Sequence, residues 1–223
     1  MNGTQLGFKL ETKELSKVAG LSALFVITSF IPISAFIGGA GFLTLSLVLV
    51  PVMAYLLRPT AAAVSALAGI LATYILQIGI GPIFGPISLL IPVSAVTLGS
   101  IGFRSRQGPL IQWAYVLFGG AFYFFISGGT PLWLIPYLIV WVTLPLALFH
   151  GKCRLPLLCL YTTMCELTTM TIASITILRL PGALWTLITP LMFYERAVAT
   201  LGSFLLIAGL RKTLPAILDP GDQ

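Results

Sequence analysis

The chain has 223 residues, of which 58% are hydrophobic and only 8% are charged. An average soluble domain is about 25% charged, so a water-soluble fold of this length has too little interior for so much apolar surface. A helical bundle in a membrane has no such limit, because lipid is itself an apolar solvent. The composition therefore predicts an all-α integral membrane protein, a multi-pass helical bundle, and excludes a soluble domain.

The net charge of +6 does not indicate a nucleic-acid partner. The 12 Lys and Arg residues stand in small groups between apolar blocks, which is the pattern of membrane topology and not a basic face. Three cysteines, Cys153, Cys159 and Cys165, lie at or within one late helix without the spacing of a disulfide framework or a zinc site, and His150 has only Cys153 nearby. We therefore expect no metal and no cofactor.

The first segment, residues 1–17, is polar and contains both acidic and basic side chains. The apolar stretch that follows is ~20 residues long, too long for the hydrophobic region of a signal peptide. In the segment itself Leu10, Leu15 and Val18 alternate with charged residues. This pattern predicts a short amphipathic lead on the cytoplasmic membrane surface.

The remaining chain is divided by Gly- and Pro-rich breaks, which are helix stops and turn formers. A spanning helix needs ~20 apolar residues, with ~17 tolerated, and this criterion predicts eight helices in one transmembrane domain, 18–210, with a tail at 211–223. Six spans are the alternative, if 79–92 or 127–135 only dips into the membrane. The predicted helices cover 18–37, 41–57, 60–79, 86–103, 109–127, 131–150, 155–178 and 190–210.

The basic residues provide a test of this count. If the eight helices alternate in direction, every Lys or Arg in a connection except Arg179 falls on the same side. The positive-inside rule then predicts a cell-membrane protein with both termini in the cytoplasm. The residues on that side are Lys9, Lys13, Lys17, Arg58, Arg104, Arg106, Lys152, Arg154, Arg211 and Lys212.

The third predicted helix begins with a run of small residues, in which Ala62, Ala66 and Gly69 share one helical face. Small residues let helices approach closely in lipid, where packing drives association. We therefore expect this face to lie inside the bundle.

The last two predicted helices carry charges inside the membrane. Glu166, Glu195 and Arg196 lie within them, and Arg179 lies at their outer edge. A charge at mid-bilayer costs at least about 2.5 kcal/mol, so such residues face the bundle interior or a cavity. Glu195 and Arg196 point ~100° apart on a helix and do not pair with each other. We therefore expect Arg196 to bridge to Glu166.

Three interpretations of these charges stay open. The first is an ion pair that only fixes helix register. The second is an outward-facing polar pocket for a small molecule, with Trp185 and Tyr194 as an aromatic wall at the membrane interface. The third is a proton or ion relay, although such relays usually recruit several Asp, Glu or His residues. No enzyme motif is present: we find no paired carboxylates with an orienting partner and no phosphate-binding loop.

Two stretches, "KELSKVAGLSALFVITSFIPI" at 13–33 and "LTLSLVLVPVMAYLLRPTAAAVSALAGIL" at 43–71, resemble the start of the substrate-binding S components of energy-coupling factor (ECF) vitamin transporters. Ala19 and Ala23 occupy the positions of the family's Ala-x-x-x-Ala face. The tail "PLMFYERAVATLGSFLLIAGLRK" is similar to the family's last helix. Arg58 replaces the usual small residue before Pro59, and the hairpin 109–150 has no counterpart among the six helices typical of the family.

The resemblance implies that Ala19 and Ala23 dock on a transmembrane coupling subunit, that two ATPase subunits supply energy, and that a vitamin-like substrate binds near the outer surface. The residues themselves allow two other functions. One is a structural or anchoring subunit of a larger membrane complex, in contact with lipid and neighbouring subunits. The other is a small channel or ion-coupled carrier. The expected substrate-binding residues are Glu166, Arg179, Trp185, Tyr194, Glu195 and Arg196.

Overall fold

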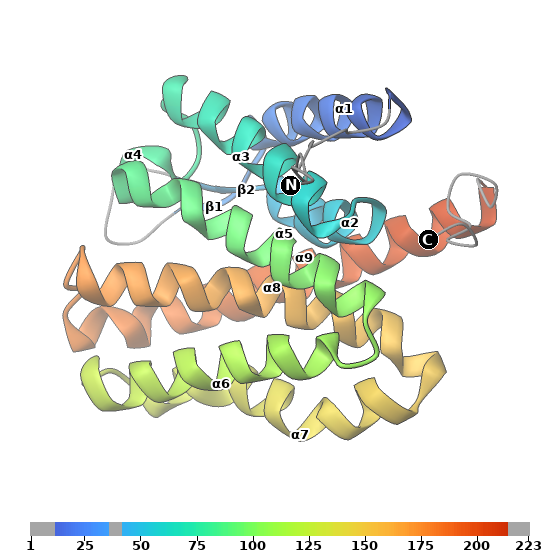
Figure 1. Ribbon diagram of the computed structural model, residues 1–223. Coiled ribbons are helices and arrows are strands. Elements are labelled where there is room, and N and C mark those ends of the chain that lie inside the picture. Colours follow the sequence, from blue (N-terminus) through green and yellow to red (C-terminus); the bar gives the residue numbers. More distant parts are fainter. Residues whose placement is uncertain (1–11, 36–41, 214–223) are drawn as a thin grey trace, which may run out of the picture.

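A computed structural model describes residues 12–35 and 42–213 of the protein (Figure 1). Most of the predicted amphipathic lead, residues 1–11, and the tail from residue 214 lie outside the described residues. The first helix, α1, spans Thr12–Ser29 and therefore includes the end of the predicted lead. Its predicted extension to residue 37 is wrong, because Pro32 lacks an N–H and disfavours helical geometry at Ile31.

A short pair of antiparallel strands follows α1. β1 covers Pro32–Ala35 and β2 covers Phe42–Thr44, with Ala35 opposite Phe42. α2 then begins at Ser46, later than the predicted residue 41, and ends at Leu56. Its 11 residues give a length of ~16 Å, about half the hydrocarbon thickness of a bilayer. Neither strand is predicted from the sequence.

Proline and glycine set the bounds of the next elements. α3 spans Pro59–Ile75, with Pro59 at the first helical position, where its missing N–H costs no hydrogen bond. Two short turns, α4 (Gly81–Phe84) and η1 (Gly85–Leu89), lead into α5, which spans Leu90–Arg104. Gly85 joins these turns with a positive φ of 58°, a conformation that glycine adopts without a steric penalty.

The second half of the chain holds the longest helices. α6 spans Gly108–Ile126, and after the short turn η2 (Pro131–Leu134) the chain forms α7, Ile135–Phe149. α8 spans Gly151–Thr176 and α9 spans Gly182–Thr213. α9 begins eight residues before the predicted position, because the helix continues through Pro190.

The described residues contain eight helices of 11 residues or more, and five segments are long and apolar enough to cross a membrane. The prediction of a helical bundle is confirmed, and five of the eight predicted spans are long and apolar enough to cross a membrane. The five segments are Gly81–Arg104, Gly108–Ile126, Pro131–Phe149, Gly151–Thr176 and Gly182–Thr213.

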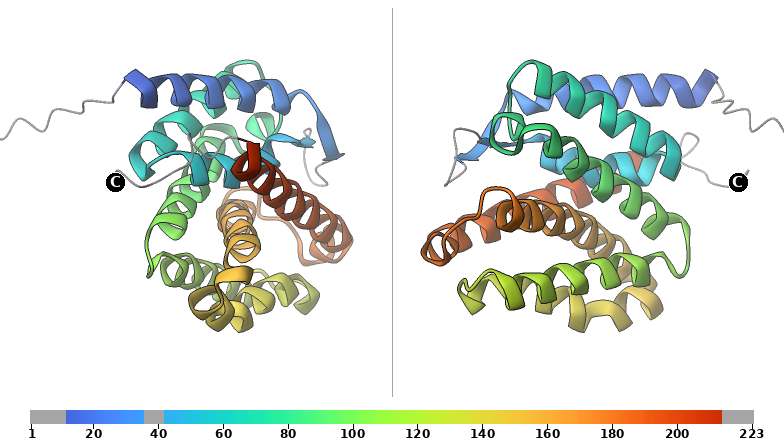
Figure 2. Two further views of the ribbon diagram at one scale, coloured as in Figure 1. Left: turned by 90° about the vertical axis from the view of Figure 1, so that its right-hand side faces the viewer. Right: turned by 60° about the vertical axis from the view of Figure 1, so that its left-hand side comes forward.

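α8 is the central helix of the bundle. It packs against α2, α5, α6, α7 and α9, and Figure 2 shows it between the layer that contains α1–α3 and the pair α6–α7. Threonines on α8 bond with its neighbours. Gln112 donates to Thr162 at 3.0 Å, and Tyr137 donates to Thr171 at 3.1 Å. Such interhelical bonds hold polar side chains inside a membrane bundle and help to fix the helix register.

The small-residue face of α3 lies inside the bundle, as predicted. Ala62 and Ala66 are fully buried, and a Cβ added at Gly69 would lie 2.9 Å from the ring of Phe25 on α1. This close approach leaves no room for a larger side chain. The same principle applies between α5 and α8, where a Cβ at Gly99 would meet Thr162 at 2.6 Å.

Candidate functional site

The buried charges lie toward one end of the bundle, away from most of the basic residues. At this end α1 and α3 finish, α2 and α5 begin, and the two strands cross the helix ends (Figure 1). The turns at the opposite end carry Arg58, Arg106 and Lys152, and α9 ends there with Arg211 and Lys212. The cavities described next open between elements of the first end.

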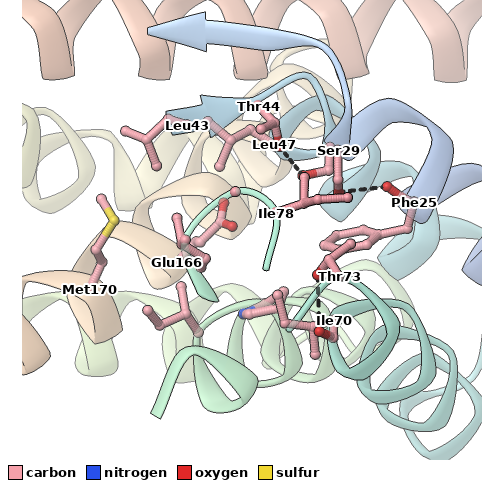
Figure 3. A pocket seen from close by; sticks show the side chains of 15 residues that line it. Phe25, Ser29, Leu43, Thr44, Leu47, Ile70, Thr73, Ile78, Glu166 and Met170 are labelled. Atoms are coloured by element: carbon pink, nitrogen blue, oxygen red, sulfur yellow. Dashed lines mark hydrogen bonds between the residues drawn. The ribbon is translucent and has the colours of Figure 1, made fainter. Parts of the chain in front are cut away.

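The first cavity has an empty volume of about 400 Å³. Figure 3 shows Glu166 and Met170 of α8 on one side of it and Phe25 and Ser29 of α1 on the other. Most of its wall is aliphatic, and Glu166 is the charged residue among its described lining residues. The remaining lining residues are Leu43, Thr44, Ser46, Leu47, Ile70, Thr73, Ile78, Gly79, Ile80, Ile91 and Pro92.

Several hydroxyl groups line this first cavity. Ser29 donates to the carbonyl of Phe25 at 2.7 Å, and Thr73 donates to the carbonyl of Ile70 at 2.9 Å. Thr44 and Ser46 bond to each other at 2.8 Å. A hydroxyl that donates to the backbone keeps acceptor capacity on its oxygen. Together with the Glu166 carboxylate, these groups make the polar part of the wall rich in acceptors.

A second cavity, with an empty volume of about 300 Å³, adjoins the first. Leu43 of β2 and Met170 of α8 line both cavities and form the partition between them. Glu195 is the charged residue in the described wall of this second cavity. Its other lining residues are Ala35, Trp133, Ile188, Leu191 and Met192.

Arg196 forms the predicted bridge to Glu166. Its Nη1 lies 3.5 Å from Oε2 of Glu166 and also donates to the carbonyl of Thr163 at 2.8 Å. Both charged side chains are buried. Charge-assisted hydrogen bonds between N–H and carboxylate usually measure about 2.7–2.9 Å. The contact is therefore an ion pair that stops short of a strong hydrogen bond.

Glu195 does not pair with its neighbour Arg196, as predicted from their angular separation. The hydroxyl of Ser34 on β1 donates to Oε1 of Glu195. Among residues 12–35 and 42–213, no ion pair within 4.0 Å involves Glu195, although it is only 2% exposed. This carboxylate thus lies buried at a cavity wall without a direct cationic partner in the described part of the chain.

The charged cluster of Glu166, Glu195 and Arg196 is incomplete in its hydrogen bonds. Oε2 of Glu166 and both Nε and Nη2 of Arg196 are buried and have no hydrogen-bond partner among the described residues. Buried polar atoms in folded proteins almost always have a partner, either in the protein or in bound solvent or ligand. These three atoms remain open to a further hydrogen bond, for which an ordered water is the ordinary partner at a buried polar site.

The structure does not bring every predicted residue to this cluster. Arg179 is exposed in the turn between α8 and α9, and Tyr194 is 54% exposed on the outer face of α9. Neither is among the described residues that line the two cavities. The expectation that these two residues contribute to the site rests on their predicted place at the outer membrane interface, and in the structure both are exposed.

Trp185 packs behind the wall of the second cavity. It is 1% exposed and packs edge-on against Trp133 and Tyr123, with ring centroids 4.8 Å and 5.1 Å away. Trp133 itself lines the second cavity, so Trp185 lies one side chain behind the wall. An aromatic side chain thus lines the second cavity, but it is Trp133, with Trp185 packed behind it, and not the predicted pair of Trp185 and Tyr194.

Sequence reasoning missed most of the cavity walls, including Leu43, Trp133 and Met170, and it missed Ser34, the hydrogen-bond partner of Glu195. Ser34 and Leu43 lie on strands too short to show an alternating pattern, and Trp133 lies in the turn η2. Met170 follows Glu166 by four positions and so shares its helix face, which is the one signal that pointed to it.

The proposed docking residues Ala19 and Ala23 lie on the outer face of α1. Both are exposed, and a Cβ added at Gly20 beside them would meet no atom within 4 Å. Leu24 and Ile27 extend this apolar face and are 43% and 60% exposed. The face is open to lipid or to a partner.

Comparisons of the chain with protein families, with curated proteins and with solved structures found no match. The assignment to a function therefore depends on the geometry of the cavities and their charges.

Proposed function

We propose that the protein is a membrane-embedded substrate-binding subunit that captures a small molecule for uptake. The observation that carries this proposal is the incomplete ion pair of Glu166 and Arg196 beside a cavity that Glu166 lines. Apolar walls with a few placed polar groups are typical of small-molecule sites, and the first cavity has such walls. A register-fixing ion pair alone needs no adjoining cavity.

The energy for uptake would come from partner subunits. We found no nucleotide-binding motif in the sequence, so ATP use requires a separate ATPase. The resemblance to ECF S components supplies the candidate arrangement, in which α1 docks on a coupling subunit through Ala19 and Ala23. The exposure of both residues supports this part of the proposal, because a docking face must be accessible.

The direct test is mass spectrometry of the protein purified in mild detergent. We expect a bound small molecule to be released on unfolding from the wild type and to be absent from Arg196→Leu and Glu166→Gln. Arg179→Leu, which replaces an exposed basic residue, is the matched control and should retain the molecule. A folded wild-type protein that carries no small molecule and takes up none from a cell extract would contradict the proposal and favour a structural subunit.

The proposed topology has eight spans with both termini in the cytoplasm, and Cys153 makes it testable. Cys153 is exposed at the basic end, whereas Cys159 and Cys165 are buried. We expect a membrane-impermeant maleimide to label the protein in inside-out vesicles and not in right-side-out vesicles. Cys153→Ser should remove the labelling. Labelling of Cys153 from the outer face would reverse the orientation and place the cavities on the cytoplasmic side.

A further inference from the structure

The second cavity combines a carboxylate with an indole and aliphatic or thioether walls. Glu195 is its charged residue, Trp133 its aromatic residue, and Met170 and Met192 provide sulfur. Trp is the best aromatic partner for a cation, and thioethers are polarizable. Among its described lining residues there is no Lys or Arg, so the second cavity presents a carboxyl group and an aromatic ring without a basic side chain.

The cluster contains more acidic than basic side chains. Glu166 and Glu195 are both buried, whereas Arg196 is the one Lys or Arg that is buried within residues 14–35 and 42–213. Arg196 is engaged with Glu166 and the carbonyl of Thr163. A buried charge without a partner is expensive in a medium of low polarity. Glu195, which has no ion-pair partner among the described residues, lies at the wall of the second cavity, where a cation would meet its carboxyl group.

We infer that the ligand is an organic cation, whose charged nitrogen lies against Glu195 and Trp133 in the second cavity. This inference rests on the proposed function and names its substrate class. The apolar walls exclude a strongly hydrated inorganic ion and favour a substituted ammonium or a protonated ring. A molecule that displaces the Leu43 and Met170 partition reaches the first cavity, where the acceptor groups suit a tail that carries hydroxyl or amine donors.

The alternative of an anionic ligand finds little support in the cavity walls. The unpartnered Nε and Nη2 of Arg196 are donors suited to an anion, but Arg196 is not among the described residues that line either cavity. An anion would instead meet the carboxylates of Glu166 and Glu195. Repulsion at both walls would oppose its binding.

Three benzyl probes of different charge test the inference: benzyltrimethylammonium, benzyl alcohol and phenylmethanesulfonate. Binding to the full-length protein in detergent is measured by calorimetry and by the shift of the unfolding midpoint. We expect the cation to bind at least about tenfold more tightly than the other two, the effect of one desolvated charge pair. Glu195→Gln keeps the acceptor for Ser34 and should remove most of this preference.

One further variant tests the aromatic contact, and another is a control at an exposed position. Trp133→Leu should weaken cation binding by about threefold to thirtyfold, as expected for one cation–π contact. Tyr194→Phe changes the exposed residue beside Glu195 and should change nothing. If Glu195→Gln does not fold, the Trp133 variant and the wild-type charge preference still decide the question.

A failure of the cationic assignment can be distinguished from a failure of the proposed function. Equal or tighter binding of the alcohol or the sulfonate, or an unchanged preference in Glu195→Gln, would overturn the cationic assignment while leaving small-molecule capture intact. Tight binding of Na⁺ or K⁺ in place of the organic cation would overturn it as well. The absence of binding by all three probes, together with no co-purified molecule, would overturn both this inference and the proposed function.

Discussion

Replacing Arg196 by leucine is expected to destabilise the protein by about 3–5 kcal/mol, the usual cost of removing one partner of a buried ion pair. The change leaves Glu166 and Glu195 buried at 4% and 2% exposure with no buried cation among the described residues. It also removes the bond to the carbonyl of Thr163. The measurement is the unfolding midpoint in detergent, with the yield of monodisperse protein as a second readout.

A double variant gives this prediction its internal test. Glu166→Gln together with Arg196→Leu removes one of the two stranded carboxylates, so we expect it to recover part of the loss. Arg179→Leu, on the exposed turn, should stay within about 0.5 kcal/mol of the wild type. If Arg196→Leu were as stable as the Arg179 variant, the ion pair would not contribute to the fold, and the cluster would be solvated.

Replacing Gly108 by alanine is expected to be the most damaging single-methyl change between α5 and α6. A Cβ at Gly108 would lie 2.2 Å from the carbonyl oxygen of Ile101 and 2.6 Å from Cα of Gly102. These are backbone atoms, so no side-chain rotation relieves the overlap and the two helices must separate. We expect a loss of about 3 kcal/mol, the upper part of the usual range for overpacking.

Gly151 provides the matched control for this substitution. Like Gly108 it is the first residue of a helix, but a Cβ there would meet no atom within 4 Å. Gly151→Ala should leave stability unchanged or raise it by up to about 1 kcal/mol, because alanine restricts the unfolded chain. Equal unfolding midpoints for the two variants would show that the close approach of α5 and α6 is absent in the protein.

Much of the fold was predictable because proline and glycine mark the helix ends. Pro59 and the glycine at 108 begin helices where the sequence indicated a break. Pro190 shows the limit of this signal, since α9 runs through it. The strands were not predictable, because three or four residues are too few to show a period of two.

The candidate site was predictable only where local geometry decides it. The bridge from Arg196 to Glu166 follows from two long side chains on neighbouring helices and from the cost of an unpaired buried charge. The partner of Glu195 could not be deduced, because Ser34 is 161 positions away and lies in a strand. Tyr194 adjoins Glu195 in the sequence but is exposed, because helix phase determines which way each side chain points.

The packing of α6 and α7 has a consequence for how this architecture can change. Within the described residues, neither helix supplies a side chain to the two cavities, and only Trp133 from the turn between them does so. The pair is held mainly along one flank of α8. The sequence of this hairpin can therefore change without altering most of the cavity walls. A change in the turn η2 would alter the wall at Trp133 while the rest of the bundle stays the same.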